Sequence, residues 1–314
     1  MTIATQIDEH FNPNLSSVYK VIDLIKPYLH EGQVLILRST LFPGVSEKIY
    51  SYLRAENINV GVSFCPERIA QGKALEELKM IPQIISGSDS RTLEIVRFLF
   101  SKINPNIIEL SMTEAELAKL FSNAWRYIKF AVANQFYMIA AEKDLDFYRI
   151  RKAMMLEYDR AADFPIAGFA AGPCLFKDTM QLAAYNRQNF TLGTSAMLIN
   201  ETLPDFLVEQ EKREYSLTGV RVGILGMAFK ADNDDMRESL AYKLRKILLY
   251  EGAIVLCTDP YIKDESFSPL ETVLESCELI FIGCPHSVYR EIQFKGQKKV
   301  FDCWNLYPNK NTGL

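Results

Sequence analysis

The feature that most constrains this fold is one long segment, residues 113–142, that contains no glycine or proline. Its first residues, TEAE, fit a capping box in which Thr113 is the N-cap and Glu116 is its partner. The segment therefore predicts a single helix over 113–142, far longer than the average helix of a globular domain. One small domain cannot cover the apolar surface of such a helix, so the pattern favours contact with a second copy of the chain.

Apolar strand patterns alternate with helical patterns on both sides of this segment. Before it, QVLILRS (33–39) and NVGVSF (59–64) read as strands; after it, VRVGILG, AIVLCTD, ELIFIG and KVFDC predict further strands. Such alternation is typical of parallel α/β sheets. We therefore predict an α/β fold with two Rossmann-like parallel-sheet domains joined by a long-helix middle domain. The predicted domains are 1–110, 111–214 and 215–314.

Composition argues against several classes of protein. The chain has 314 residues and a net charge of −4, which argues against a strongly basic nucleic-acid-binding protein. No apolar run reaches the roughly 18 residues that a membrane-spanning helix needs, and no secretory signal is visible. These observations predict a cytoplasmic protein with no nucleic-acid partner and no membrane span.

The chain contains six cysteines, none of them in a CxxC pair, so their spacing predicts neither a zinc site nor a disulfide framework. We expect no bound metal. Cys174 stands apart because it lies between small residues and a Lys-Asp pair in GFAAGPCLFKDT (168–179). Small residues such as Gly172 allow a ligand to approach the backbone closely, and the charge of Lys177 would favour the thiolate. Without other signals, however, a cysteine is most often a buried apolar side chain.

The sequence contains no G-x-G-x-x-G loop of the kind that binds dinucleotides. The nearest match is GILGMAF, in which Gly223 and Gly226 follow a predicted strand. This spacing is equally consistent with a tight turn that needs small residues.

Five stretches carry a more specific signal through their order and spacing. They are STLFPG (39–44), CPERIAQG (65–72), EAELAKLFSNAW (114–125), GFAAGPCLFKD (168–178) and GMAFKADNDDMRES (226–239). Together they resemble the UDP-glucose/GDP-mannose dehydrogenase family, and the resemblance covers nearly the whole chain. It implies that the chain oxidises the C6 alcohol of a UDP-sugar to a carboxylate with two NAD, for polysaccharide biosynthesis. It also implies a homodimer formed through the middle domain.

The resemblance implies that Cys174 is the nucleophile of this reaction. A thiolate that adds to the intermediate aldehyde forms a thiohemiacetal, and its oxidation leaves a thioester for water to hydrolyse. The family pattern implies that Lys177 serves the cofactor and that Asp178 serves catalysis. Lys119 and Asn123 are four residues apart on the predicted helix, so they share one face and suit the stabilisation of a developing alkoxide.

Other site residues are also implied by the resemblance. Glu67 comes directly after a predicted strand, where ligand sites of parallel sheets lie, and matches a glutamate that activates water for thioester hydrolysis. Thr40 matches a threonine that positions this water and contacts the cofactor. The remaining implied contacts are Phe229, Lys230 and Gly172 with the UDP-sugar, Arg237 with the cofactor diphosphate, and Arg160 with the substrate of a partner subunit.

The first residues, MTIATQIDEHFNPNLSSV, resemble a segment midway through the NAD domain of family members. We therefore expect a truncated first domain that lacks part of the NAD site, and a chain that binds a UDP-sugar but is weak or inactive as a dehydrogenase. CPER favours the branch that acts on UDP-N-acetylhexosamines over the branch that acts on UDP-glucose. Two alternatives stay open. They are a non-catalytic nucleotide-sugar-binding paralogue and, with less support, a β-hydroxyacid or 6-phosphogluconate-type dehydrogenase.

Overall fold

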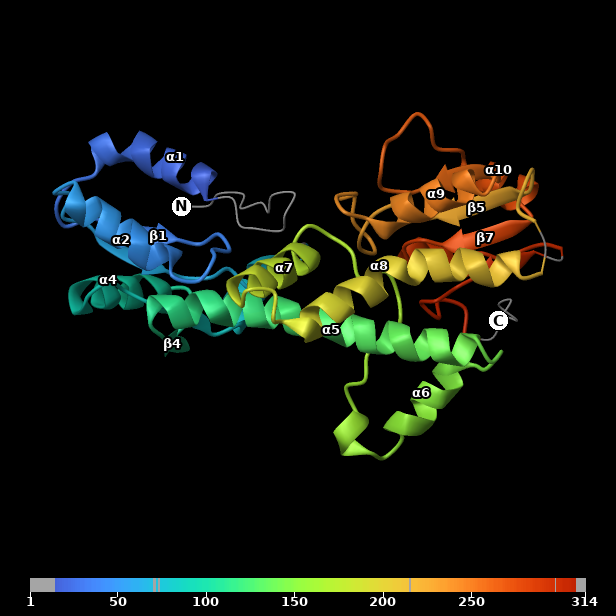
Figure 1. Cartoon of the computed structure of the whole chain (residues 1–314), viewed down its shortest axis with the longest axis horizontal. Helices are drawn as coiled ribbons and strands as arrows, with labels where there is room; N and C mark the ends of the chain where they lie inside the picture. Colours follow the sequence, from blue (N-terminus) through green and yellow to red (C-terminus); the bar gives the residue numbers. More distant parts are fainter. Residues whose placement is uncertain (1–14, 70–71, 73, 215, 297, 309–314) are drawn as a thin grey trace. The chain divides into compact units, whose positions relative to one another are not determined.

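The computed structural model describes residues 15–69, 72, 74–214, 216–296 and 298–308. Residues 1–14, which carry most of the stretch that resembles the middle of an NAD domain, lie outside the described residues. The chain forms two compact units (Figure 1). Unit 1 contains the residues up to Trp125 together with Lys177–Thr191, and unit 2 contains Arg126–Phe176 and the residues from Leu192 onward. The three predicted domains, with boundaries after residues 110 and 214, stay a prediction.

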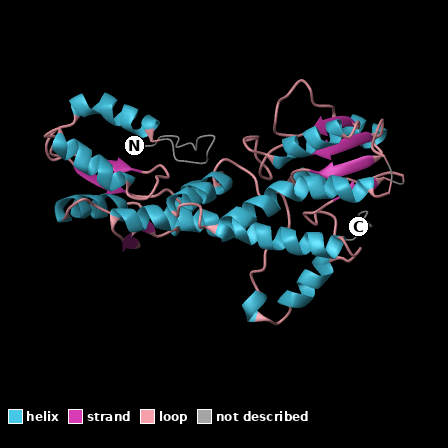
Figure 2. Ribbon diagram, viewed as in Figure 1, coloured by secondary structure: helices cyan, strands magenta, loops and turns pink. Residues whose placement is uncertain are grey.

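Unit 1 contains two pairs of parallel strands with helices beside them (Figure 2). β1 (Val34–Leu37) pairs with β2 (Gly61–Phe64), and β3 (Gln83–Ile85) pairs with β4 (Ile107–Glu109). Leu37 lies opposite Phe64, so the carboxyl ends of β1 and β2 meet at one edge. The helices of this unit are α1 (Ser16–Ile25), the 3-10 turn η1 (Lys26–Tyr28), α2 (Val45–Ala55), α3 (Ala74–Met80), α4 (Ser90–Ser101), the first part of α5 (Met112–Ala141) and most of α7 (Leu175–Tyr185).

An apolar core holds α1 and α2 against the β1–β2 pair. Val18 of α1, Ile49 of α2 and Phe64 of β2 are fully buried in it. The residues of α1 that contribute to this core recur at helical spacing. The helix ends at Ile25, because Pro27 follows within one turn and lacks the N–H that would continue the helix.

The long helix α5 is present, but its capping residues differ from the prediction. The Ser111 hydroxyl accepts the N–H of Glu114 at 3.3 Å, and the Glu114 carboxylate accepts the N–H of Ser111 at 2.8 Å. This reciprocal pair is a capping box two residues before the predicted one. The assignment of Thr113 and Glu116 as the capping pair was therefore wrong.

Glu116 instead stabilises the start of a different helix. Its fully buried carboxylate accepts hydrogen bonds from the N–H of Gly44 at 2.5 Å and the N–H of Ser46 at 2.8 Å, both at the start of α2. The hydroxyl of Ser46 donates a further bond at 2.6 Å. Burial raises the pKa of Glu116, and the hydrogen bonds from Ser46 and Gly44 offset part of that rise. The first turns of α5 thus fix the start of α2, which follows the loop after β1.

Unit 2 contains the four-stranded parallel sheet that the sequence predicts, in the order β6-β5-β7-β8. Its strands are β5 (Arg221–Leu225), β6 (Ile254–Thr258), β7 (Leu279–Ile282) and β8 (Lys299–Phe301). Its helices are the rest of α5, α6 (Phe147–Met155), the 3-10 turn η2 (Asp159–Ala161), α8 (Thr191–Lys212), α9 (Leu240–Tyr250), α10 (Leu270–Ser276) and the 3-10 turn η3 (Ser287–Glu291). The sequence HSVYREI (286–292) predicts a helix, but the segment forms only η3, because the backbone becomes extended at Ile292.

Helices cover both faces of this sheet. Phe281 of β7 is buried together with Leu207 of α8 and Leu244 of α9, whereas the residue before it on the strand, Ile280, is buried with Val273 of α10. The alternation follows from the two-residue period of a strand. Parallel sheets joined by a long helix confirm the predicted α/β fold class. Within the described part of the chain, no helix combines the length and the apolar character that crossing a membrane requires.

Candidate functional site

Polar side chains gather at the carboxyl edge of β1 and β2 in unit 1. Glu67 follows β2, and its carboxylate pairs with the guanidinium of Arg38, which follows β1. The same carboxylate accepts the N–H groups of Arg68 at 2.9 Å and Ile69 at 3.1 Å. Burial raises the pKa of Glu67, but Arg38 and the N–H groups of Ile69 and Arg68 together hold the pKa below its usual value. Glu67 is therefore a carboxylate at neutral pH. Thr40, two residues after Arg38 in the sequence, is half-buried.

Lys119 brings an ammonium group to the same edge. It lies on α5, and its Nζ donates a hydrogen bond to the backbone carbonyl of Glu67 at 2.7 Å. The contact joins residues that are 52 positions apart in the sequence. Glu67 and Lys119, which the resemblance implies as site residues from two separate stretches, are therefore neighbours in unit 1.

Asn123, one turn further along α5, contacts the start of α7. Its side-chain amide donates to the carboxylate of Asp178 at 2.5 Å, and both side chains are buried. Lys177 forms an ion pair with the other carboxylate oxygen of Asp178 at 2.7 Å. The structure thus brings Asn123, Asp178 and Lys177 together. The four-residue spacing of Lys119 and Asn123 puts both on one face of α5, as predicted.

Cys174 differs from the other cysteines in its surroundings. Of the six, all within the described part of the chain, it is the exposed one. Burial raises the pKa of the others, to about 11 for Cys257, which makes them poor nucleophiles. Cys174 directly precedes Leu175, the first residue of α7. Among the described cysteines it is therefore the thiol that a reactant can reach.

The loop that carries Cys174 packs against the segment 226–239 of unit 2. Gly172 has a φ of +100°, and a Cβ at this position would lie 2.5 Å from the ring of Phe229. The N–H of Gly172 also donates to the carbonyl of Glu238 at 3.3 Å. Only a glycine combines this backbone conformation with such a close approach. The loop with Gly172 and the segment 226–239 are both implied to contact the substrate, and they are in contact with each other.

Arg237 lies near the same loop. Its guanidinium forms a two-point ion pair with Asp235, with contacts of 3.0 Å from Nε and 2.6 Å from Nη2. The pKa of Arg237 is raised, first by the hydrogen bond and charge of Asp235 and to a smaller extent by the proximity of Cys174. The structure therefore supplies a cation close to the exposed thiol.

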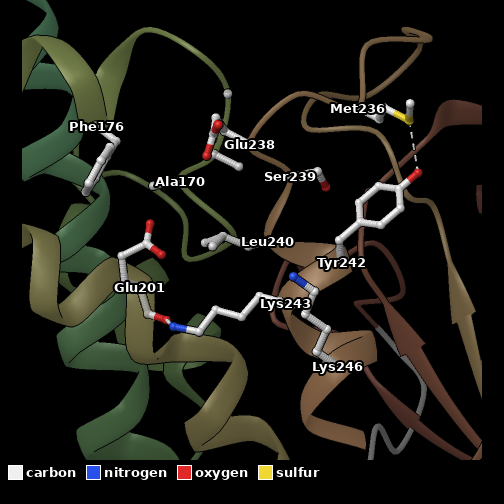
Figure 3. Close-up of a pocket in the computed structure, with 12 residues that line it drawn as sticks. Ala170, Phe176, Glu201, Met236, Glu238, Ser239, Leu240, Tyr242, Lys243 and Lys246 are labelled. Atoms are coloured by element: carbon white, nitrogen blue, oxygen red, sulfur yellow. Dashed lines mark hydrogen bonds between the residues drawn. The ribbon is translucent and has the colours of Figure 1, made fainter. Parts of the chain in front are cut away.

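A cavity of about 570 Å³ opens beside this loop within unit 2 (Figure 3). Figure 3 shows Lys243 reaching from α9 toward Glu201 of α8, and the hydroxyl of Tyr242 meeting the sulfur of Met236. Burial raises the pKa of Glu201, while Lys243 opposes the rise. The lining residues are Ala170, Ala171, Gly172, Phe176, Glu201, Met236, Glu238, Ser239, Leu240, Tyr242, Lys243 and Lys246.

Of these lining residues, only Gly172 is among the site residues expected from the sequence. The helix α9 begins directly after RES (237–239). Its residues Tyr242, Lys243 and Lys246 are spaced to share one side of the helix, and this spacing could have indicated that they belong to the site. Glu201 carried no comparable signal, because it comes from α8, far away in the sequence.

The remaining implied residues take simpler positions. Arg160 lies on η2, where its Nη1 is 3.4 Å from the hydroxyl of Tyr158. Lys230 is exposed and follows Phe229 in the segment after β5.

The implied site residues fall into two groups. Glu67, Lys119, Asn123, Lys177, Asp178 and Thr40 belong to unit 1, and Gly172, Cys174, Phe229, Lys230, Arg237 and Arg160 belong to unit 2.

Comparison with known families gives matches along most of the chain. Residues 1–104 match the NAD binding domain of the UDP-glucose/GDP-mannose dehydrogenase family, 113–202 match its central domain, and 223–309 match its UDP binding domain. The three domains occur in one order on one chain. The chain belongs to the UDP-glucose/GDP-mannose dehydrogenase family.

Individual relatives in this family agree with the match. The chain is 29% identical to the UDP-N-acetyl-D-mannosamine dehydrogenase of Methanocaldococcus jannaschii, over 91% of the chain and 67% of that protein. The solved UDP-D-ManNAc dehydrogenase of Pyrococcus horikoshii superposes with a TM-score of 0.90 at 26% identity, over 100% of the chain and 79% of that structure. A UDP-glucose dehydrogenase of Pyrobaculum islandicum gives a TM-score of 0.88 at 25% identity, over 98% and 76%.

Membership in the dehydrogenase family makes the chain an enzyme with NAD as its cofactor. Dinucleotides bind parallel sheets at the carboxyl ends of the strands, which is the edge where Arg38 and Glu67 meet. Among the described residues, Nη1 of Arg38 is buried without a hydrogen-bond partner. An unused cationic donor at this edge fits a cofactor that carries phosphate groups. Arg38 and Glu67 therefore fit part of a dinucleotide site.

Proposed function

We propose that the chain oxidises the C6 alcohol of a UDP-sugar to the carboxylate, with a UDP-N-acetylhexosamine as the preferred substrate. Support for the sugar class comes from the CPER stretch and from relatives that are named UDP-N-acetyl-D-mannosamine dehydrogenases. UDP-glucose is the second candidate substrate, because similar relatives carry that name too. The reaction would serve polysaccharide biosynthesis.

The observation that carries this proposal is the exposed thiol of Cys174 at the start of α7. Bound NAD supplies a hydride acceptor for each of the two oxidations. After the alcohol has become an aldehyde, the Cys174 thiolate adds to the carbonyl carbon, and the carbonyl oxygen takes up a proton to give a thiohemiacetal. Loss of that proton and of a hydride from the same carbon gives a thioester. Water then attacks the thioester, the thiolate leaves, and the carboxylate product is released.

Five side chains of unit 1 have the chemistry to assist these steps. The Glu67 carboxylate, kept ionised by Arg38, would accept a proton from the attacking water. The ammonium of Lys119 and the amide of Asn123 would stabilise negative charge on the substrate oxygen. Asp178 would hold Asn123 in position through the 2.5 Å hydrogen bond, and Thr40 would position the water.

The remaining proposed roles are in binding. Phe229, Lys230 and Gly172 would contact the UDP-sugar, while Lys177, Arg237 and Thr40 would contact the cofactor. Arg160 would reach the substrate of a second copy in a homodimer. Exposed apolar side chains on α5, such as Phe136 and Ile139, support such a dimer, and light scattering of the purified chain tests it.

The experiment is to incubate the purified chain with NAD and each of UDP-N-acetylmannosamine, UDP-N-acetylglucosamine and UDP-glucose. We expect NADH and uronate to form in a ratio of about two to one, and Cys174→Ser to abolish uronate formation. Stabilisation of the chain by UDP without NADH formation from any UDP-sugar would favour a non-catalytic nucleotide-sugar-binding protein. Full turnover by Cys174→Ala would contradict the covalent step and would favour a β-hydroxyacid or 6-phosphogluconate-type dehydrogenase.

A further inference from the structure

Two buried ionisable side chains meet at the carboxyl edge of the sheet in unit 2. Asp259 follows β6, His286 follows β7, and neither side chain is exposed to solvent. The Asp259 Oδ2 atom lies 3.0 Å from Nε2 of His286 and accepts the N–H groups of Met227 at 2.7 Å and Ala228 at 3.0 Å. The other oxygen, Oδ1, accepts N–H groups of the loop after β6. Asp259 therefore holds the first residues of the loop that follows β5.

The second ring nitrogen of His286 holds the same loop further along. Nδ1 accepts the N–H of Asp232 at 2.9 Å. Because Nδ1 accepts, the ring proton lies on Nε2 and is donated to Asp259. The carboxylate of Asp232 in turn accepts the N–H and hydroxyl of Ser287 at 2.8 and 2.9 Å. Asp232 has a φ of +55°, an uncommon conformation for this residue type that these contacts maintain.

Between the two anchored ends lie Phe229 and Lys230. Asp259 holds residues 227 and 228, and His286 holds residue 232, so the pair fixes both ends of a short backbone segment. The side-chain hydrogen bonds of His286 end on this loop and on Asp259 rather than on the strands of the sheet. A buried polar pair whose side-chain hydrogen bonds go to a loop and not to the strands is suited to positioning that loop rather than to stabilising the core.

We propose that His286 and Asp259 are positioning residues that set the loop 227–232 for binding of a uridine diphosphate group. The proposal rests on the function proposed above, in which Phe229 and Lys230 contact the UDP-sugar. Neither His286 nor Asp259 touches the nucleotide; both act through the loop backbone. The ring of Phe229 also packs on Gly172, so the same pair influences the loop that carries Cys174.

Three substitutions of His286 separate its two hydrogen bonds. His286→Gln keeps an amide donor near the position of Nε2 and loses the acceptor for Asp232. His286→Asn keeps an acceptor near the position of Nδ1 and loses the donor to Asp259. His286→Ala loses both. If the alanine variant does not fold, the glutamine and asparagine variants still decide the question, because each retains one of the two bonds.

The readout is the affinity of the full chain for UDP, measured by calorimetry. We expect His286→Ala to bind UDP about tenfold more weakly or worse, and the glutamine and asparagine variants to fall between it and wild type. Val273→Ala is the matched control, because Val273 of α10 is fully buried in an apolar cluster of the same unit that includes neither His286 nor Asp259. It should lower the melting temperature while leaving UDP affinity unchanged.

Two results would overturn the proposal, and they differ from each other. If wild type binds UDP and the His286 variants bind it equally well despite a lower melting temperature, the pair is structural and the positioning role is wrong. If wild type does not bind UDP, the proposed substrate class fails, and the assignment of the loop fails with it.

Discussion

The side-chain amide of Asn123 donates a 2.5 Å hydrogen bond to the carboxylate of Asp178, 55 residues further along the chain. Asp178 is fully buried, and its carboxylate is held by this bond and by the ion pair with Lys177. Removing a partner from a buried charge costs more than removing a partner from a neutral group. The contact therefore links the long helix α5 to the segment that follows Cys174.

Replacing Asn123 tests this link directly. Asn123→Ala removes a donor from a buried carboxylate, and we expect the free energy of unfolding to fall by about 1.5–3 kcal/mol. Urea denaturation at neutral pH measures the change. Asn123→Asp has nearly the same size but brings a second carboxylate against Asp178, so it should destabilise more than alanine does. Wild-type stability in the aspartate variant would show that the pair does not behave as described.

The ion pair of Glu67 and Arg38 predicts a pH-dependent stability. The pKa of Glu67 is depressed below its usual 4.5, because the effect of burial is outweighed by Arg38 together with two backbone hydrogen bonds. A depressed acid pKa contributes stability that is present above the unfolded-state pKa and is lost as the pH falls through the folded-state pKa. Arg38→Gln should therefore destabilise more at about pH 7 than at about pH 3.

The control for this prediction is Arg97→Gln, which breaks the exposed pair of Arg97 and Glu109. Exposed pairs contribute little to stability, so we expect a small effect at both pH values. An Arg38→Gln effect that is the same at both pH values would mean that the charge of Glu67 does not depend on Arg38.

The exposure of Cys174 predicts selective chemical modification. With a limiting amount of iodoacetamide at neutral pH, we expect one thiol per chain to react quickly and peptide mass spectrometry to place the label on Cys174. The other cysteines are buried, so their labelling should require unfolding. Cys174→Ser should remove the fast phase. Rapid labelling of several cysteines would contradict the described burial.

The contact of Gly172 with Phe229 predicts that even a methyl group is not tolerated. Gly172→Ala would place a Cβ 2.5 Å from the ring in a backbone conformation that disfavours side chains. We expect a loss of about 1–3 kcal/mol from the backbone conformation, with a further loss from the steric clash. Gly219→Ala is the matched control, because Gly219 has a φ of +78° and a Cβ added there would meet no atom within 4 Å. Equal stability losses in the two variants would mean that the Phe229 contact is unimportant.

Some features of the site could be predicted because they depend on short-range periodicity. The spacing of Lys119 and Asn123 predicts that both lie on one face of a helix, and the apolar run before Glu67 predicts its position at a strand end. Both expectations agree with the contacts in the structure. Strand and helix periods are local properties, so a single sequence reveals them.

Other features depend on contacts between distant segments. The capping box lies at Ser111 rather than Thr113, because two overlapping S/T-x-x-E patterns compete and the buried start of α2 takes the carboxylate of Glu116. The sequence did not predict the pair of Asp259 and His286 either, because its partners come from loops after three different strands. Only the strand order brings these loops to one edge.

The buried carboxylate of Glu116 has a consequence for the order of folding. It lies 70 residues after Ser46, whose N–H and hydroxyl it accepts. During synthesis from the N-terminus, α2 emerges from the ribosome well before the residue that satisfies its first N–H groups. The β1–α2 connection therefore reaches its final form only after α5 has begun to form, which makes it a late event in vectorial folding.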